Sequence, residues 1–292
     1  MSNPRIPFQM SDRRRTLPPM AGKPLMVHIV VNLEYWAFDQ PMPRALLPSP
    51  HGLRSVPDVP NFSWAEYGLR AGLSRFLRLF GERDLPVSVS LNAGVIDVYP
   101  QACDAVLNAG WEIIAHGVRQ RSLQAEDNEQ AVIETSLERI ERFSGQRPRG
   151  WLGPGLGESF ETPDLLSAAG IDHLYDWALD DLPTWMRTST GPLVAVPYGL
   201  ELNDSVLHAV ESYPSDEIFL RVRDTLAAFS PELVLQPRVL TLGLHPHLLG
   251  VPHRVVHLER TLELLMERHD VVFVTGTRLV DWYREVEPAD IG

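Results

Sequence analysis

The stretch LMVHIVVNLEY, residues 25–35, decides the fold class of this 292-residue chain. It is a β-branched apolar run with the length of one strand, and it ends in a carboxylate and an aromatic side chain, Glu34 and Tyr35. Such a run predicts a β-strand. We therefore expect the main domain to begin with a strand whose end carries polar and aromatic groups.

The segments that follow alternate between helical and strand patterns about seven times. Helical spacing of apolar residues marks segments such as 64–85, 127–144 and 253–270, and strand patterns lie between them, as in 86–93 and 111–117. This alternation predicts parallel strands joined by helical crossovers. Because one barrel commonly takes ~250 residues, we expect an α/β fold, a single distorted TIM-like (β/α) barrel of about seven strands.

Two segments stand apart from this alternation. Residues 1–24 are rich in proline and arginine and are predicted to form an N-terminal arm, which leaves 25–292 as the catalytic barrel. Residues 36–63 contain six prolines and no periodicity. A loop of that length in a compact domain is usually functional, so we expect a lid over the site, with an oligomer contact or an ordered surface loop as the alternative.

Composition excludes several classes of protein. The net charge of −12 repels phosphate backbones, so nucleic acid is not an expected partner. The chain has no apolar run near the ~20 residues of a membrane helix, and its N-terminus does not resemble a secretory signal. The single cysteine, Cys103, allows no intrachain disulfide and no thiolate zinc cluster, and is expected to be a buried core thiol. These features predict a cytoplasmic protein.

Chemistry in such a barrel lies where strands end and loops begin. Each candidate there has a structural alternative: a strand-end salt bridge for Glu34, a backbone carbonyl partner for His116, a helix cap for Asp180, and core packing for the tryptophans. Convergence of several groups at one barrel end favours function. The candidates are Glu34, Tyr35, Trp36, His116, Arg119, Trp151, Pro154, Trp177, Asp180, Asp181, Tyr198, His245 and His247.

Four of these strand ends carry a family resemblance. NLEYW (32–36), HGVRQ (116–120), GWLGPG (150–155) and LGLHP (242–246) resemble, in order, the four motifs of the polysaccharide deacetylase family. Metal-dependent members bind their metal with the second Asp of the first motif and two histidines of the second, and the matching residues here are Tyr35, His116 and Gln120. A catalytic zinc takes three protein ligands, and of these three residues only His116 matches a ligand of the family. The resemblance therefore implies the family's barrel fold but no metal or other cofactor.

The chain resembles a divergent branch more closely, the cofactor-independent allantoinases and cyclic imide hydrolases. The similarity lies in HGVR (116–119), DDLPTW (180–185), PY (197–198) and above all GLHPHLLGVPHR (243–254). It implies hydrolysis of a ring C–N bond in a small cyclic ureide or imide, and a homotetramer.

The residues suggest roles in such a reaction. Glu34 is expected to activate water, with partial burial beside Tyr35 and Trp36 raising its basicity. Arg119 or His116 would stabilise the oxyanion. A histidine near its ordinary pKa of ~6.5 would protonate the leaving nitrogen, with His245 as first candidate and His247 as second. The predicted substrate-binding residues are Tyr35, Trp36, Trp151, Pro154, Trp177, Asp180, Asp181, Tyr198 and His247.

Two other functions stay open at this point. One is a metal-dependent deacetylase of a polysaccharide or N-acetyl sugar that uses Glu34, His116 and His247 as unusual ligands. The other is a catalytically dead binding protein, against which the presence of Glu34 and His245 argues.

Overall fold

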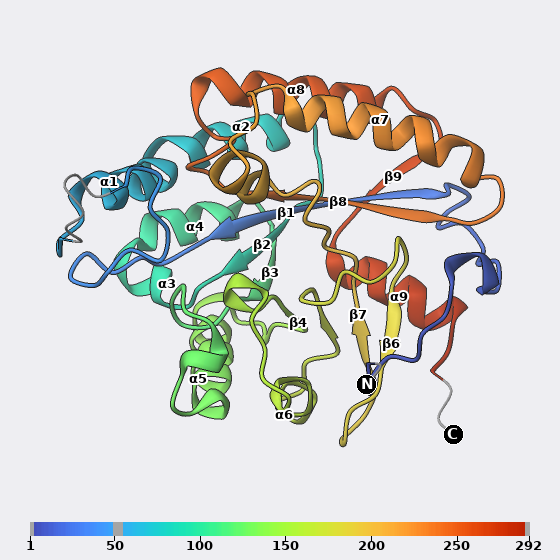
Figure 1. Cartoon of the computed structure of the whole chain (residues 1–292), viewed down its shortest axis with the longest axis horizontal. Helices are drawn as coiled ribbons and strands as arrows, with labels where there is room; N and C mark the ends of the chain where they lie inside the picture. The colour runs from blue at the N-terminus through green and yellow to red at the C-terminus, as the bar shows by residue number, and fades with distance from the viewer. Residues whose placement is uncertain (1–2, 49–54, 290–292) are drawn as a thin grey trace.

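The computed structural model describes residues 3–48 and 55–289, and these form one sheet flanked by helices (Figure 1). The strands of the described residues lie in the order β6-β7-β5-β4-β3-β2-β1-β8, with β9 beside β1. All pairs are parallel except β6 with β7. The strands are β1 (Leu25–Leu33), β2 (Ser88–Leu91), β3 (Glu112–Ala115), β4 (Gly150–Trp151), β5 (His173–Leu174), β6 (Thr184–Met186), β7 (Leu193–Ala195), β8 (Arg238–Leu244) and β9 (Val271–Val274).

β1 is the centre of the sheet, as its apolar sequence predicts. Every residue of the strand is buried. One edge pairs with β8 along most of its length, from Leu25↔Arg238 to Val31↔Leu244, and the other edge pairs first with β9 and then with β2. The strand ends at Leu33, so Glu34 is the first residue beyond it.

The sheet curls into an incomplete barrel. Among the described residues, no further full strand pairs with the outer edge of β8, but amides of β8 still find partners. Gly243 N donates to Leu202 O at 3.1 Å and Val239 N donates to Asp181 O at 2.8 Å. The prediction of a distorted (β/α) barrel is correct. The described residues form nine strands rather than about seven, and one of the nine, β6, forms a short antiparallel hairpin with β7.

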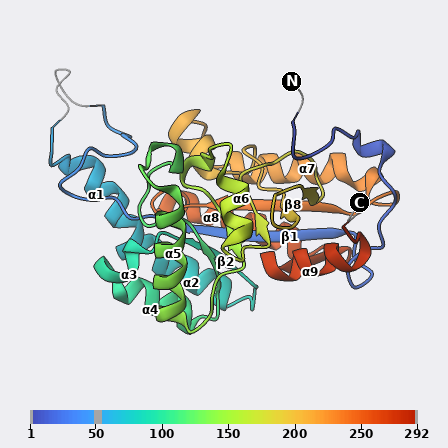
Figure 2. The ribbon, with the colours of Figure 1, turned by 90° about the horizontal axis from the view of Figure 1, so that it is seen from below.

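Helices cover the outside of the curled sheet. Figures 1 and 2 show α7 and α8 side by side on one side of β1 and β8, with α9 on the opposite side. None of the helices in the described ranges is long and apolar enough to cross a membrane. The α-helices are α1 (Val59–Tyr67), α2 (Leu73–Gly81), α3 (Gly94–Val98), α4 (Pro100–Asn108), α5 (Glu129–Ser144), α6 (Thr162–Ala168), α7 (Glu217–Glu232), α8 (Pro252–Met266) and α9 (Gly276–Val286).

The predicted loop 36–63 ends earlier than its sequence suggests. Helix α1 begins at Val59, where the carboxylate of Asp58 caps the amide of Asn61. Pro60 is no obstacle, because proline is tolerated in the first turn of a helix, where its missing N–H has no partner to lose. The described part of the loop is held by the Asn61 amide oxygen, which accepts from Leu46 N and Leu47 N at 2.8 and 2.9 Å. Residues 49–54 of the predicted lid lie outside the described residues.

The described part of the N-terminal arm packs on the barrel. Ile6, Leu17 and Met20 are buried. Arg14 makes an ion pair with Asp180 at 2.9 Å, and both side chains are nearly buried. Cys103 is a buried free thiol whose pKa burial raises to about 12, which confirms its place in the core.

Candidate active site

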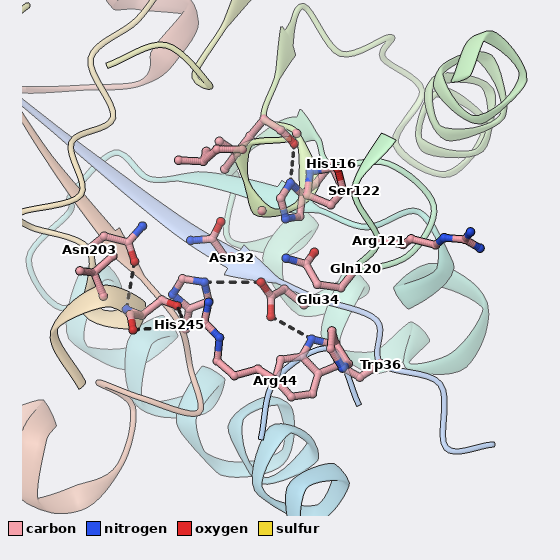
Figure 3. A pocket seen from close by; sticks show the side chains of 18 of the residues that line it. Asn32, Glu34, Trp36, Arg44, His116, Gln120, Arg121, Ser122, Asn203 and His245 are labelled. Atoms are coloured by element: carbon pink, nitrogen blue, oxygen red, sulfur yellow. Dashed lines mark hydrogen bonds and ion pairs between the residues drawn. The ribbon is translucent and has the colours of Figure 1, made fainter. Parts of the chain in front are cut away.

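One cavity of about 310 Å³ lies at the carboxyl ends of β1, β3, β4 and β8 (Figure 3). This is the end of a barrel at which catalytic groups are expected. The volume is at the small end of the range for ligand pockets. Its polar lining comes mainly from Asn32, Glu34, Trp36, Arg44, His116, Gln120, Tyr198, Asn203, His245 and His247.

Three ionisable side chains form a row at one wall of this cavity. Glu34 Oε1 lies 3.5 Å from His245 Nε2, and His245 Nδ1 lies 2.6 Å from Asp204 Oδ1. Trp36 Nε1 donates to Glu34 Oε2 at 2.9 Å and so fixes the carboxylate. The imidazole is thus held between two carboxylates, one facing the cavity and one fully buried behind it.

The row has strong electrostatic consequences. Burial alone would raise the pKa of Glu34, but the hydrogen bond and charge of His245 outweigh it and lower that pKa to about 2. Burial alone would lower the pKa of His245, but Asp204 and Glu34 raise it to about 10. At neutral pH the pair is therefore a carboxylate and an imidazolium. The expectations of a more basic Glu34 and of a His245 with an ordinary pKa are both wrong.

His116 presents a lone pair to the cavity. Its Nδ1 is hydrogen-bonded to the carbonyl oxygen of Leu152, and since a carbonyl only accepts, Nδ1 carries the proton. Its Nε2 is buried and has no partner among the described residues. Burial lowers the pKa of His116 despite the nearby charge of Glu34, so the ring is neutral. His116 is thus an acceptor, and the predicted positive charge at this position is not present.

His247 has a different environment from His245. Its ring meets those of Trp36 and Trp64 edge-on, with centroids 5.5 and 4.6 Å apart. Burial and the charge of His245 lower its pKa to about 4, so it is a neutral ring at pH 7. A Cβ on Gly68 would lie 2.4 Å from His247 N, so only glycine lets the turn after α1 pack against this loop.

Tyr198 belongs to a hydrogen-bonded framework under the cavity. Its hydroxyl accepts from Asn32 Nδ2 at 3.0 Å and from Asn203 Nδ2 at 3.2 Å. Ser90 Oγ donates to Asn32 Oδ1 at 2.5 Å. The framework ties the end of β1 to the loop that carries Asp204, so it keeps the two carboxylates on either side of His245.

Several of the predicted site residues do not line this cavity. Trp151 is fully buried in the core, and Trp177 donates to Glu158 at 2.6 Å instead. Asp180 is bound to Arg14, and with Asp181 it lines a separate hollow of about 680 Å³ beneath the arm. Arg119 turns to Glu126 at 3.5 Å, and the Tyr35 ring packs beside Gly94. Of the predicted residues, those that line the cavity are Glu34, Trp36, His116, Pro154, Tyr198, His245 and His247.

Comparisons with known proteins agree with the fold described above. No protein-family model matches the chain. A Schizosaccharomyces pombe protein named "Putative polysaccharide deacetylase" is 26% identical over 264 residues, which cover 83% of this chain and 81% of that protein. The crystal structure of a probable polysaccharide deacetylase from Pseudomonas aeruginosa PAO1 is 26% identical, with a TM-score of 0.84 over 95% of this chain and 97% of the other. The chain is therefore similar in sequence and in fold to polysaccharide deacetylases.

A second solved structure, of an allantoinase, is similar to the chain to the same degree. Puue allantoinase is 26% identical to this chain and superposes with a TM-score of 0.85, covering 95% of this chain and 96% of the allantoinase. The polysaccharide deacetylase type of barrel is therefore confirmed, and the resemblance to its allantoinase-like branch has a structural counterpart.

The family's metal does not fit the residues present here. The three matching positions supply a phenol, an imidazole and an amide, from Tyr35, His116 and Gln120. Catalytic zinc takes three ligands from histidine, carboxylate or thiolate side chains. In the part of the chain that the structure describes, no group of three such side chains is arranged to hold a metal, including the alternative set of Glu34, His116 and His247. No step of the reaction is therefore assigned to a metal.

Sequence patterns miss Asp204 and Arg44. Asp204 precedes the π-helical turn Ser205–Val210, away from any predicted strand end, and Arg44 lies in the proline-rich loop. Neither position has a periodic or motif signal. Both residues reach Glu34 and His245 only through the tertiary fold. In that fold β8 pairs with β1, and the chain that follows β7 returns to the cavity.

Proposed function

We propose that this chain opens a C–N amide bond of a small cyclic imide or ureide by general-base activation of water, without a metal. Its relatives named above include a deacetylase and an allantoinase, so the chain is a hydrolase of carbon–nitrogen bonds outside peptides. The observation that carries the finer proposal is the row Glu34, His245 and Asp204 at a small cavity whose metal positions hold Tyr35 and Gln120.

The reaction follows from the placement of the base and the acid. Glu34 takes a proton from water as the water oxygen bonds to a ring carbonyl carbon, and the carbonyl π electrons move to oxygen. When the intermediate collapses, the C–N bond breaks and the nitrogen takes a proton from His245 Nε2. The proton on Glu34 then returns to His245, which is 3.5 Å away. One water has been added across one C–N bond.

The perturbed pKa values link the two proton transfers. Glu34 is ionised at every working pH, since its pKa is about 2, but the imidazolium that keeps it ionised also weakens it as a base. That weakness is relieved as His245 gives its proton to the leaving nitrogen, because the charge that lowers the Glu34 pKa then disappears. A ring nitrogen stabilised by an adjacent carbonyl suits this coupled transfer, since it leaves with little negative charge.

His116 supports a substrate that carries an N–H. Its Nε2 is a buried acceptor without a partner among the described residues, and an unpaired buried acceptor costs free energy, about 1–3 kcal/mol. The N–H of an imide or ureide ring would satisfy it and fix the ring relative to Glu34. An ester or a fully substituted amide could not.

Activity on a panel of rings tests the proposal. Purified protein should hydrolyse succinimide, hydantoin or a related ring at a rate unchanged by dialysis against a strong chelator. The alternative, a metal-dependent polysaccharide or N-acetyl sugar deacetylase, requires release of acetate and loss of activity on chelation, restored by zinc. Release of acetate with metal dependence would therefore replace this proposal. Cytoplasmic location and homotetrameric assembly stay predictions, for cell fractionation and light scattering to test.

A further inference from the structure

The positive charge expected at the oxyanion is missing from both residues predicted to supply it. Arg119 is turned to Glu126 outside the cavity, and His116 is neutral. His245 carries a charge, but its Nε2 proton is needed by the leaving nitrogen. Attack of water on a carbonyl concentrates negative charge on oxygen, and a preorganised donor for that charge is usually the largest single contribution to such catalysis. A further donor at the cavity, and above all a cation, would therefore stabilise the oxyanion.

Two arginines line the cavity, and only one is directed into it. Arg121 donates to the carbonyl of Ala125 and lies 3.7 Å from Glu126, and Figure 3 shows it pointing away from Glu34. Arg44 reaches across the cavity from the loop after β1, toward His245 (Figure 3). The guanidinium of Arg121 is thus directed away from Glu34, whereas that of Arg44 is directed into the cavity.

Arg44 is anchored but not neutralised. Its Nη1 donates to the backbone oxygen of Ser205 at 3.2 Å and to the Ser205 hydroxyl. Within the described ranges it makes no ion pair with a carboxylate. Both bonds use one nitrogen, so Nε and Nη2 remain as donors in the planar fork that matches a carboxylate or an oxyanion.

Charge changes at this wall during ring opening. The substrate ring is neutral, the tetrahedral intermediate is an anion, and the product is a carboxylate, formed when the new acid loses a proton. A guanidinium without an ion partner interacts weakly with the neutral ring and strongly with the two anionic species. Such differential binding speeds the chemical step without tightening substrate binding.

We infer that Arg44 is a catalytic residue that receives the oxyanion of the tetrahedral intermediate and then the carboxylate of the opened product. This inference rests on the proposed function and assigns to a side chain the charge that a metal supplies elsewhere in the family. It also defines the substrate class further, as neutral rings that become anions on opening.

The test compares Arg44→Gln and Arg44→Lys with the control Arg119→Gln, using succinimide and its opened product succinamate. Arg44→Gln should lower kcat on the order of 10²–10³-fold, the usual cost of one oxyanion donor, with KM changed little. It should weaken succinamate binding, measured by calorimetry, on the order of tenfold or more, since hydrogen bonds to charged groups are worth that much. Arg44→Lys, which keeps the charge, should lie between, and Arg119→Gln should match the wild type.

Three outcomes decide the matter. Unchanged kcat and succinamate affinity in Arg44→Gln, at an unchanged thermal midpoint, would overturn the inference. A raised KM with normal kcat would also overturn it, because Arg44 would then bind the neutral ring. If the wild type opens no ring, the proposed function fails, and the succinamate titration still decides whether Arg44 forms an anion site.

Discussion

The substitution Asp204→Asn is the most direct test of the charged row formed by Glu34, His245 and Asp204. Asp204 Oδ2 accepts the backbone amides of His245 and Leu249 at 2.8 and 3.3 Å, while Oδ1 faces His245 Nδ1 at 2.6 Å. In the asparagine variant the amide oxygen must face the two backbone N–H groups. The NH₂ group then faces Nδ1, which has to become an acceptor. The substitution therefore favours a neutral His245 that carries its only proton on Nε2.

The size of the effect follows from the pKa of His245. The net rise from 6.5 to about 10, which burial opposes, corresponds to roughly 5 kcal/mol, so Asp204 and Glu34 together contribute at least that much. Asp204 makes the closer contact, 2.6 Å against 3.5 Å, so it supplies the larger share. Without it we expect the pKa of His245 to fall to neutrality or below. The pKa of Glu34 should rise at the same time, because the charge that lowers it is lost.

The pH dependence of kcat/KM on the best ring substrate measures both changes. The wild type requires ionised Glu34 and protonated His245, so its activity should be level through neutral pH and fall as pH rises toward about 10. In Asp204→Asn the alkaline fall should move from about 10 down to neutral pH or below, and turnover at pH 7 should drop on the order of 10²–10⁴-fold, the range for general acid–base groups.

A matched control separates this effect from simple loss of a buried charge. Asp180 is also a nearly buried, paired carboxylate, but it lies beneath the arm and outside the cavity. Asp180→Asn should lower the thermal midpoint without moving the pH profile. An unmoved alkaline limb in a folded Asp204→Asn variant would refute the assignment of His245 as an imidazolium held by Asp204.

Other perturbations give further expected outcomes. Glu34→Gln should cut turnover on the order of 10²–10⁴-fold, measured by single-turnover kinetics, and near-normal turnover would remove Glu34 from the mechanism. His247→Phe keeps the ring between the tryptophans and should cost kcat far less than His245→Gln, and equal losses would show that His247 takes part in proton transfer. The free energy of unfolding should fall as pH drops from 6.5 to about 4, because unfolded chains protonate His28 and His247, whose folded pKa values are both lowered to about 4. Denaturant titrations should show a shallower fall for His247→Phe, and an identical slope would contradict the buried neutral state. Adding succinimide should slow hydrogen exchange in residues 36–48 if the loop closes as a lid, and unchanged exchange would count against closure.

The local sequence determined the barrel and the strand ends that carry candidate catalytic residues. The mostly apolar run of β1 is typical of a parallel strand buried on both faces, and helix and strand periods are set by neighbours along the chain. Glu34, His116 and His245 follow strands, and parallel strands bring their carboxyl ends to one edge whatever the loops do. The amino-acid sequence is therefore sufficient to identify these three residues as candidates.

Tertiary structure alone decided what those residues are chemically. The pKa of His245 depends on Asp204. The carbonyl of Leu152 decides which nitrogen of His116 carries the proton, and burial keeps that ring neutral. Both partners are remote in sequence, at 41 and 36 residues. Loops likewise decided which arginine reaches the cavity, since the candidate Arg119 turns to Glu126 while Arg44, which no sequence pattern indicated, lines the cavity. Charge and desolvation act through space, so the sequence could name the groups but not their protonation or their partners.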